Sequence, residues 1–571
     1  MDRYDRQNYT YGKSATKNLF NSSVLLLGSR NHLLTEIAKN LLLSGVNKLY
    51  FNEESNTRGY LELNELNPMC KMEVVSDYVK VIEDNNPLVI KCGGSKQDAV
   101  VVNNLCREHG SKLIWCLSSG VSGFIFVDVL DSHEVKDLDG ETIDPLQIEN
   151  ISTEGNIEVI GDLNNVKDND IIKFSSLVGN NIDFLREKKY RILIKNKNTV
   201  SLINLDESTI DKELFEKMDV QNGSIYIEKS GKTFAHDSLE SFINRLDAAG
   251  GPTILNDSFN EFFDIQVLRL LLSDIEVIDD VWSSDMDDRV RRMTDNNVGR
   301  IRRSLGIEIP CISSIIGSSV SNEAIKILTK KFKPISQWFV YSDHNLVPKN
   351  KPIMSNQFEE NPELSLSYLM GSEFSSFIKN SSLLMVGCGA IGCEMLKNLA
   401  QLGFSTAGDG KIIVTDPDHI EVSNLSRQFL FRNEHVKLSK SKVAAEQLKK
   451  FNSNINILPL DQKMCPENQE LTDKLFLNEN IIGVINALDN VDARRYMDEQ
   501  CFNFVKPLFE SGTQGMKGNT QPVIPFLTET YSNSNDPDQE KSFPVCTIKN
   551  FPNQIHHTIH YAMDMFDNFR R

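Results

Sequence analysis

The chain has 571 residues, of which 40% are hydrophobic and 25% are charged, and its formal net charge is −18. A single packed core stops growing near about 300 residues, so this length predicts several domains. The negative net charge argues against a general nucleic-acid-binding protein. The sequence contains no run of about 18 apolar residues, so it does not predict a membrane span.

The cysteines and the start of the chain bear on the compartment. None of the ten cysteines forms a Cys-x-x-Cys pair, which disfavours a zinc knuckle or a disulfide framework. The charged start, residues 1–7, lacks an apolar signal segment. We therefore expect reduced thiols and a cytoplasmic and nuclear protein.

A first strand, helix, strand unit is predicted near the N-terminus. Residues 21–28 are apolar and strand-like, residues 33–43 have helical spacing with a glycine stop at Gly45, and residues 48–53 form the next strand-like run.

The pattern changes from about residue 131. Short alternating segments separated by Asn, Asp and Gly predict a small β domain, and residues 237–304 turn helical and acidic. Residues 348–363 have the composition of a linker.

A second strand-and-helix segment is predicted from Ser382. Its apolar run ends in Gly387, Gly389 and Gly392 and passes into the helix-like residues 394–402. Glycine lets the backbone approach a phosphate, and a helix N-terminus favours anions. The pattern predicts a nucleotide-binding crossover, with a tight turn in a parallel sheet as the alternative.

The two strand-and-helix segments align with each other, with one extra residue in the first. The matched pairs include Asn21 with Asn380, Gly28 with Gly387, Glu36 with Glu394, Lys39 with Lys397 and Gly45 with Gly403. The match predicts an internal duplication, with two unrelated crossovers as the alternative. The first copy has lost two of the three glycines, so we expect it to be a structural partner and the second copy to be the working site.

Polar residues follow the second glycine turn. Asp416 and Asp418 end the next strand, where a carboxylate is placed to bind ribose hydroxyls. Asn424, Arg427 and Lys440 then form a polar and basic segment. Such donors and cations suit a triphosphate that is attacked at its α-phosphorus, with Mg²⁺. A solvated Arg/Lys face is the alternative.

A later strand, residues 483–488, ends in Asp489 and Asn490. Ligands of open α/β sheets bind beyond the carboxyl ends of the strands, so Asp489 is predicted to point into the same crevice as Asp416 and to bind Mg²⁺. An N-cap role of Asp489 for the next helix is the alternative, and both roles are compatible.

The motifs at residues 387–392, 416–418, 423–431, 487–494 and 510–513, in this order, resemble the active adenylation domain of the ubiquitin-activating enzyme family. Residues 525–531 and 543–557 continue the match. The resemblance is strong from about residue 382 to residue 566. It is fainter but colinear before that.

The resemblance implies an α/β fold with two Rossmann-like adenylation domains, one inactive and one active, an inserted small β domain and a helical bundle. The implied segments are the inactive adenylation domain (1–130 and 301–348), the first catalytic-cysteine half-domain (131–206), a four-helix bundle (207–300), a linker (349–364), the active adenylation domain (365–530) and the start of the second catalytic-cysteine half-domain (531–571). The chain resembles a truncated form that lacks the domain for docking conjugating enzymes.

The resemblance also implies a two-stage reaction. MgATP adenylates the C-terminal carboxylate of ubiquitin, and the thiol of Cys546 then forms a thioester for transfer to a conjugating enzyme. The implied nucleotide-binding residues are Gly387, Gly389, Ala390, Gly392, Asp416, Asp418, Asn424, Arg427, Gln428, Lys440, Asp489 and Asn490. Asp489 is implied as the Mg²⁺ ligand, with Asp418 as a weaker candidate, and the implied catalytic residues are Arg6, Arg427, Lys440 and Cys546.

Other readings stay open. Residue chemistry alone does not separate Cys546 from the other nine cysteines. The substrate could be another ubiquitin-like protein, or the chain could be an inactive binding module with the adenylation fold. A dinucleotide-dependent oxidoreductase is a further rival, disfavoured by the basic segment. We expect a monomer with an internal pseudo-dimer, and neither nucleic acid nor membrane as a partner.

Overall fold

The protein is described from a computed structural model. The described residues are 3–29, 31–52, 63–140, 145–160, 163, 166, 168–186, 188–206, 208, 210, 212–229, 231–247, 264, 267–268, 270–272, 288–348, 362–514, 517–533, 559 and 562. The chain divides into two compact units, Met1–Ser382 with Cys388–Asp461, and Leu383–Gly387 with Gln462–Arg571. Each unit is described by itself.

The first unit contains a seven-stranded sheet in the order β15-β6-β5-β4-β1-β2-β3. Its strands are β1 (Ser23–Leu27), β2 (Lys48–Asn52), β3 (Lys71–Val75), β4 (Leu88–Cys92), β5 (Leu113–Ser119), β6 (Ser122–Asp128) and β15 (Trp338–Ser342). The five strands from β5 to β3 in this order pair in parallel, and β6 pairs antiparallel with both β5 and β15. The prediction of an α/β fold with parallel strands is confirmed.

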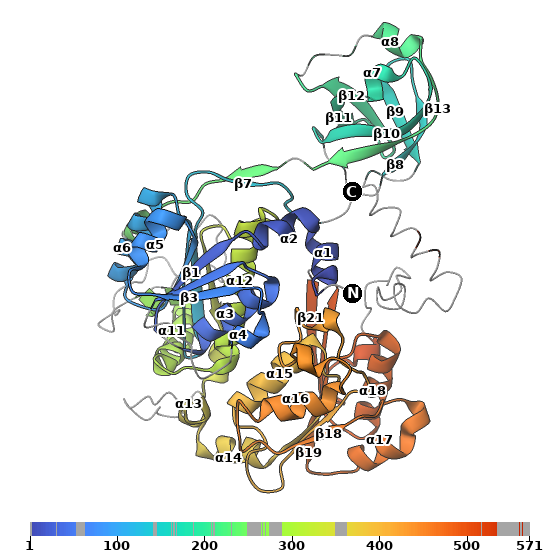
Figure 1. Cartoon of the computed structure of the whole chain (residues 1–571). Coiled ribbons are helices and arrows are strands. Elements are labelled where there is room, and N and C mark those ends of the chain that lie inside the picture. The colour runs from blue at the N-terminus through green and yellow to red at the C-terminus, as the bar shows by residue number, and fades with distance from the viewer. Residues whose placement is uncertain are drawn as a thin grey trace. The chain divides into compact units, whose positions relative to one another are not determined.

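Helices cover both faces of this sheet. They are α1 (Asp5–Tyr11), α2 (Lys13–Leu19), α3 (His32–Ser44), α4 (Leu63–Leu66), α5 (Tyr78–Asn85), α6 (Lys96–His109) and α12 (Pro310–Thr329). Figure 1 shows α5 and α6 on one side of the strands and α3 and α12 on the other. Gly317 lets α12 approach α3 closely, because a Cβ there would lie 2.9 Å from Cβ of Glu36.

The core of this sheet is apolar and tightly packed. Leu25, Val89, Leu113 and Trp115 from neighbouring strands are all buried in one cluster. The ring of Trp115 meets that of Phe124 edge to face, with centroids 4.8 Å apart. Burying each large side chain contributes about 1.5–3 kcal/mol, so this core holds the parallel strands in register.

A closed barrel with the strand order β10-β11-β12-β9-β8-β13 also belongs to the first unit (Figure 1). Its elements are β8 (Leu146–Ile151), β9 (Asn156–Ile160), β10 (Ile171–Asn180), α7 (Asp183–Arg186), β11 (Lys189–Ile194), β12 (Thr199–Asn204), α8 (Lys212–Glu216) and β13 (Asp219–Glu228). β13 closes the barrel by pairing with β10 and β8. The predicted boundary at residue 206, after which a helical region was expected, is therefore wrong, because one strand of the barrel follows it.

The remaining elements before the glycine turn are a two-stranded ribbon and several helices. They are β7 (His133–Val135), β14 (Lys232–Phe234), α9 (Leu239–Asp247), α11 (Asp288–Ser304), η2 (His344–Leu346), α13 (Pro362–Met370) and α14 (Ser372–Asn380). Residues 349–361 of the predicted linker lie outside the described residues, as do most of residues 248–287, and α13 begins within the predicted linker at Pro362.

The second crossover of the chain begins with β16 (Ser382–Val386), which belongs to the second unit from Leu383 onward. It continues in the first unit with α15 (Ala390–Gln401), β17 (Ile412–Thr415), η3 (Val422–Asn424), η4 (Asn433–His435), α16 (Lys440–Leu448) and β18 (Ile457–Leu460). β17 and β18 pair in parallel. The carboxyl end of β17 leads directly into Asp416.

The second unit contains further strands and helices. They are η5 (Pro466–Asn468), α17 (Gln469–Phe476), β19 (Ile481–Asn486), α18 (Val491–Asn503), β20 (Leu508–Gln514), β21 (Lys517–Val523) and η6 (Tyr531–Asn533). β19 pairs in parallel with β20, which pairs antiparallel with β21. Asp498 accepts hydrogen bonds from the N–H groups of Tyr531 and Ser532, which ties η6 to α18.

Among the described residues, no helix has both the length and the apolar content needed to cross a lipid bilayer.

Candidate nucleotide-binding site

Gly387 is required by the backbone where β16 ends. Its φ is +98°, which L residues rarely adopt, and a Cβ would lie 2.5 Å from the carbonyl oxygen of Ala487. The N–H of Ala487 in turn donates to the carbonyl of Val386. Gly387 therefore lets two segments of the second unit approach each other, which is a structural role.

Gly389 has a different role, because it is the N-cap of α15. Its φ is −78°, which any residue can adopt. A Cβ there would have one neighbour, Nε2 of Gln428, at 3.9 Å. Ala390 begins the helix and Gly392 lies buried in its first turn. The helix therefore starts without a side-chain cap from its N-cap residue, an arrangement that favours phosphate binding.

Asp416 follows β17 and is buried. Its carboxylate accepts the N–H of Cys388 at 2.7 Å and the N–H of Asp418 at 2.9 Å. Burial raises the pKa of Asp416 above its ordinary value, although Lys440 and these two N–H groups act in the opposite direction. The glycine turn thus fixes this carboxylate directly, and its remaining lone pairs can accept hydroxyl groups of a ligand.

Lys440 is the first residue of α16, and its Nζ lies 2.8 Å from Oδ2 of Asp418. Burial by itself would lower the pKa of Lys440, but Asp416 and Asp418 outweigh burial and raise it. Its ammonium group is therefore charged at neutral pH. Because Asp418 is exposed, this carboxylate can exchange its partner for a ligand or a cation.

The turn after η3 carries the other predicted donors. Oδ1 of Asn424 accepts the N–H of Glu421 at 3.0 Å, which leaves the amide NH₂ group as its donor. Nη1 of Arg427 donates to the carbonyl of Ser423 at 2.6 Å. Gln428 is buried, and its Oε1 has no hydrogen-bond partner among the described residues. A buried acceptor without a donor is costly, so this amide fits a site completed by a ligand N–H or O–H group.

Asp489 and Asn490 lie in the second unit, after β19. Asn490, and not Asp489, is the N-cap of α18, because its side chain accepts the N–H of Ala493 at 2.8 Å. The alternative of an N-cap role for Asp489 is therefore wrong. Asp489 is exposed, and Arg494 stabilises its turn by donating to the carbonyl of Leu488 at 2.8 Å.

Among the residues that the structure describes, no three His, Cys, Asp or Glu side chains come together as a metal site. Asp418 in the first unit and Asp489 in the second are each exposed carboxylates, and each taken by itself suits a Mg²⁺ ion that keeps waters and takes phosphate oxygens as ligands. The donor chemistry fits such an ion without a cage built from protein alone.

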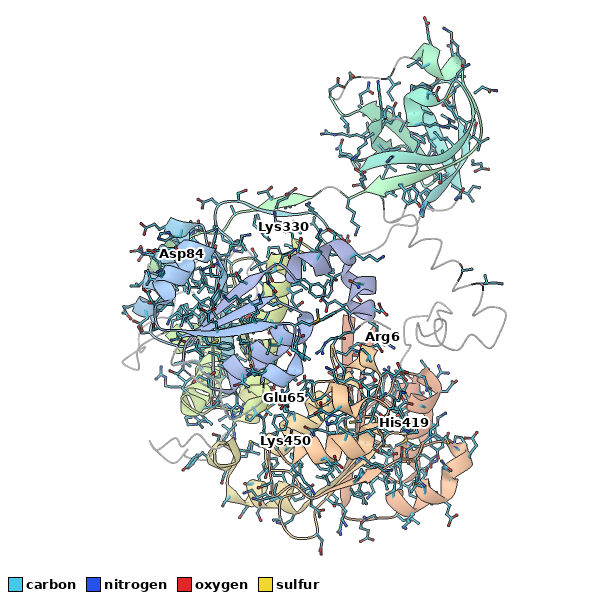
Figure 2. All side chains as sticks on the ribbon, in the orientation of Figure 1. Arg6, Glu65, Asp84, Lys330, His419 and Lys450 are labelled. Carbon is cyan, nitrogen blue, oxygen red and sulfur yellow. The ribbon has the colours of Figure 1, made fainter. Side chains whose placement is uncertain are left out.

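Two predicted catalytic residues stand apart from this set. Arg6 is exposed on α1, where Figure 2 labels it, and its carbonyl accepts the hydroxyl of Thr10. Cys546 lies outside the described residues, so its role stays a prediction. Sequence reasoning missed Arg3, whose Nη2 donates to the carbonyl of Leu425 at 2.8 Å. A lone arginine near the N-terminus carries no pattern that indicates such a contact.

The first unit brings several predicted residues together from distant positions. The backbone of Cys388 contacts Asp416, Asp418 contacts Lys440, and the amide of Gln428 lies beside Gly389. Together they present a helix N-terminus, a carboxylate, an ammonium group and an amide. These groups match the phosphates and the ribose of a nucleotide.

Comparison with known families first identifies a class. Residues 361–563 match the model of the ThiF family, so this part of the chain is similar to that family. The match covers the glycine turn, Asp416, the turn at residues 423–428, Lys440 and Asp489.

Comparison with curated proteins then identifies the relatives. Over 99% of its length the chain is 31% identical to the ubiquitin-like modifier-activating enzyme 1 of Homo sapiens, of which it covers 57%. It is likewise 31% identical over 99% of its length to the ubiquitin-activating enzyme E1 1 of Candida albicans (strain WO-1), of which it covers 59%. It is also 30% identical over 99% of its length to the ubiquitin-activating enzyme E1 2 of Arabidopsis thaliana, of which it covers 56%. The chain is thus similar to these proteins along nearly its whole length, and it spans less than three fifths of their length.

Proposed function

We propose that the chain activates ubiquitin by ATP-dependent adenylation of its C-terminal carboxylate. The observation that carries the proposal is the buried carboxylate of Asp416, held by the N–H of Cys388 from the glycine turn and facing the ammonium group of Lys440. The names of the relatives and the match to the ThiF family support the choice of substrate.

In this proposal the nucleotide lies over the N-terminus of α15. Asp416 accepts the ribose hydroxyls, and the open backbone at Gly389 receives phosphate. Asn424, Arg427 and Lys440 donate to phosphate oxygens, whose negative charge grows as the α-phosphorus is attacked. Gln428 supplies its unpartnered Oε1 to a donor of the nucleotide. Asp489, with Asp418 as the second candidate for this role, would hold Mg²⁺, which would neutralise part of the phosphate charge.

The first reaction forms one bond and breaks one bond. A carboxylate oxygen of ubiquitin attacks the α-phosphorus of ATP, and the bond to the bridging oxygen breaks, so that pyrophosphate leaves. The product is an acyl adenylate. Arg6 from the N-terminal part of the chain is proposed to bind phosphate in this step, which would explain why a degenerate first copy is retained.

The second reaction is proposed for Cys546. Its thiolate attacks the acyl carbon of the adenylate, AMP leaves, and a thioester remains. An unperturbed thiol has a pKa near about 8.5, so only a small fraction is ionised at neutral pH. A mixed anhydride is reactive enough that access and proximity of the thiol matter more than strong activation. Transfer to a conjugating enzyme would follow.

The finer architecture belongs to the same proposal. We infer two Rossmann-like adenylation domains related by duplication, the first inactive and the second active, in a monomer with an internal pseudo-dimer. The barrel is proposed to be the first catalytic-cysteine half-domain, and the helices after it to be part of a bundle. Parallel strands in both crossovers support this inference.

Intact-protein mass spectrometry tests the function. The chain is incubated with ubiquitin and MgATP, with and without a thiol reductant, as wild type and as Cys546→Ser. We expect a reductant-sensitive ubiquitin adduct in the wild type alone. Ubiquitin adenylate without an adduct would support the adenylation step and contradict the role of Cys546. If neither species forms and the chain binds no ATP, the proposal is wrong, and a non-catalytic binding module is the better account.

A further inference from the structure

Four charged side chains form a closed cluster where α3 lies against α15. Nζ of Lys39 lies 2.6 Å from Oε1 of Glu36 and 2.5 Å from Oε1 of Glu394. Nζ of Lys397 contacts Oε2 of Glu36 and lies 2.9 Å from Oε2 of Glu394. Each lysine thus binds both carboxylates. We call Glu36, Lys39, Glu394 and Lys397 the charge cluster.

Three side chains of the charge cluster are buried and Glu394 is partly exposed, and the cluster's two positive and two negative groups balance. The side chains of Lys39 and Lys397 are 0% and 2% exposed, those of Glu36 and Glu394 9% and 34%. Lys397 uses its third N–H on the hydroxyl of Ser314 in α12. Burying three of these charges is expensive, and well-packed apolar residues often stabilise a fold equally well. The cluster therefore calls for an explanation other than stability.

One aromatic side chain connects the charge cluster to the candidate site. Nζ of Lys39 lies 4.5 Å from the ring centroid of Phe429, and Nζ of Lys397 lies 5.9 Å from it. Phe429 is fully buried and directly follows Gln428. A desolvated cation over a ring face is an attractive contact that depends on position. Phe429 is thus held by one cation from each copy.

Two other contacts join the early part of the chain to the same segment. Arg3 donates to the carbonyl of Leu425 at 2.8 Å. Glu65, labelled in Figure 2, lies 3.5 Å from Nε of Arg432, whose Nη1 donates to the carbonyl of Phe429 at 2.7 Å. Residues 425–432 are therefore contacted at three points by residues that precede position 66.

We propose that Lys39 is a positioning residue for the nucleotide-binding turn, which it holds by placing the ring of Phe429 against the charge cluster. Through Phe429, the first copy determines where Gln428 and Arg427 lie relative to the N-terminus of α15. The cluster is then retained because it positions this turn. That Lys39 affects nucleotide binding rests on the proposed function. That Lys39 holds the turn in place does not rest on it.

Three variants separate positioning from simple stabilisation. Lys39→Met removes one cation and leaves the charge cluster with excess negative charge. The double variant Lys39→Met with Glu394→Gln restores neutrality and keeps the pair of Lys397 with Glu36. Phe429→Leu leaves all four charges in place and removes the ring.

The matched control is Lys48→Met. Nζ of Lys48 lies 2.7 Å from Glu73 and 4.2 Å from the ring centroid of Tyr50, so it makes the same two kinds of contact. It makes them on the sheet of the first copy, between β2 and β3, and both of its partners belong to those strands.

Amide hydrogen exchange of the full chain without nucleotide is the primary readout. We expect amides of residues 424–429 to exchange about tenfold faster in all three variants, a factor that corresponds to about 1.4 kcal/mol, and to be unchanged in Lys48→Met. The amides of α16 serve as an internal reference that should not change. Recovery of the melting temperature in the double variant without recovery of slow exchange would support positioning.

Calorimetric titration with MgATP is the second readout. We expect the dissociation constant to rise about tenfold in the three variants and to be unchanged in the control. Unchanged exchange at residues 424–429 would overturn the inference, as would an exchange rate that simply follows the melting temperature across all variants. Failure of the wild type to bind ATP would instead contradict the proposed function, while the exchange data would still decide the inference.

Discussion

The two glycine turns of the chain share their first glycine and differ at the start of the helix that follows. A Cβ at Gly28 would lie 2.2 Å from the carbonyl oxygen of Cys92, and a Cβ at Gly387 would lie 2.5 Å from that of Ala487. Both glycines have positive φ, +136° and +98°. In each turn the first glycine serves the close approach of two backbone segments.

The helix starts are occupied differently. In the first copy, the side chain of Asn31 accepts the N–H of Leu34 at 2.8 Å, and Glu308 accepts the N–H of His32 at 2.7 Å. The N-cap of the second helix is Gly389, which has no side chain to cap it. Side chains of the chain itself thus satisfy N–H groups at the start of α3, whereas α15 has no side-chain cap. The proposed function places phosphate at the start of α15 and not at the start of α3.

The largest effect is expected where the copies are alike. Gly28→Ala and Gly387→Ala should each destabilise the chain by roughly 3 kcal/mol, because a Cβ would meet a carbonyl oxygen and strain the backbone. Thermal unfolding should show apparent melting temperatures lower by about 6–12 °C. A large decrease in melting temperature for only one of the two variants would contradict the structural equivalence of the two turns.

The next effect should appear where the copies differ. Gly389→Asn gives α15 the cap that α3 has, at a backbone conformation that asparagine adopts freely. We expect the affinity for MgATP to fall at least about 30-fold, through loss of about 2 kcal/mol of phosphate binding, while stability stays equal or rises slightly. Calorimetry and thermal unfolding measure the two quantities. Unaltered affinity would show that phosphate does not lie over this helix.

A smaller effect is expected at the strand that follows each turn. β2 ends at Asn52, whereas Asp416 follows β17, so Asp416→Asn makes the second copy resemble the first. The amide keeps one acceptor but loses the charge that faces Lys440, and we expect MgATP affinity to fall about tenfold, or about 1.4 kcal/mol. A fluorescent ATP analogue can report this loss. The control is Asp461→Asn, which removes a more exposed carboxylate paired with Lys442 and should leave the affinity unchanged.

The smallest effect concerns pH and the charge cluster, in which both copies take part. Burial by itself would raise the pKa of Glu394, but Lys39 and Lys397 outweigh burial and lower it from 4.5 to about 2. A carboxylate whose pKa is depressed by folding stabilises the protein above its unfolded pKa. This stability is lost as the pH falls from about 4.5 to about 2. The melting temperature of Glu394→Gln should therefore fall less steeply than that of wild type over this range.

Glu73→Gln is the matched control for the pH measurement. It removes a more exposed carboxylate that pairs with Lys48 on the sheet, so a change of the acid profile that both variants share is not specific to the charge cluster. A Glu394→Gln profile parallel to wild type would show that the charge cluster does not titrate as described.

The crossovers were predictable from sequence because local patterns determine them. The apolar runs at residues 21–28 and 382–386 contain β1 and β16, and the glycine stop at Gly45 is the left-handed C-cap of α3, with φ +85°. The carboxylate after β17 was predictable for the same reason, since an acid directly after an apolar strand lies at the end of the sheet.

The charge cluster was not predictable in this way. Glu36 and Lys39, three residues apart on a helix, have the spacing of a solvated ion pair, yet Lys39 is fully buried. Its second ion-pair partner, Glu394, lies on α15, which carries the same two residue types, and periodicity does not predict which helices come together. The contact of Arg3 with Leu425 escapes sequence reasoning for the same reason, because more than four hundred residues separate the two.

Ubiquitin-dependent exchange of labelled pyrophosphate into ATP tests the central claim most directly. We would measure it for wild type, Gly389→Asn and Asn31→Gly, the last of which uncaps α3 at a cost of only a few tenths of a kcal/mol. The account predicts exchange that requires ubiquitin, that is lost in Gly389→Asn and that is unchanged in Asn31→Gly. Exchange that persists in Gly389→Asn, or that fails in Asn31→Gly while the chain remains folded, would contradict the assignment of the working site to the second copy.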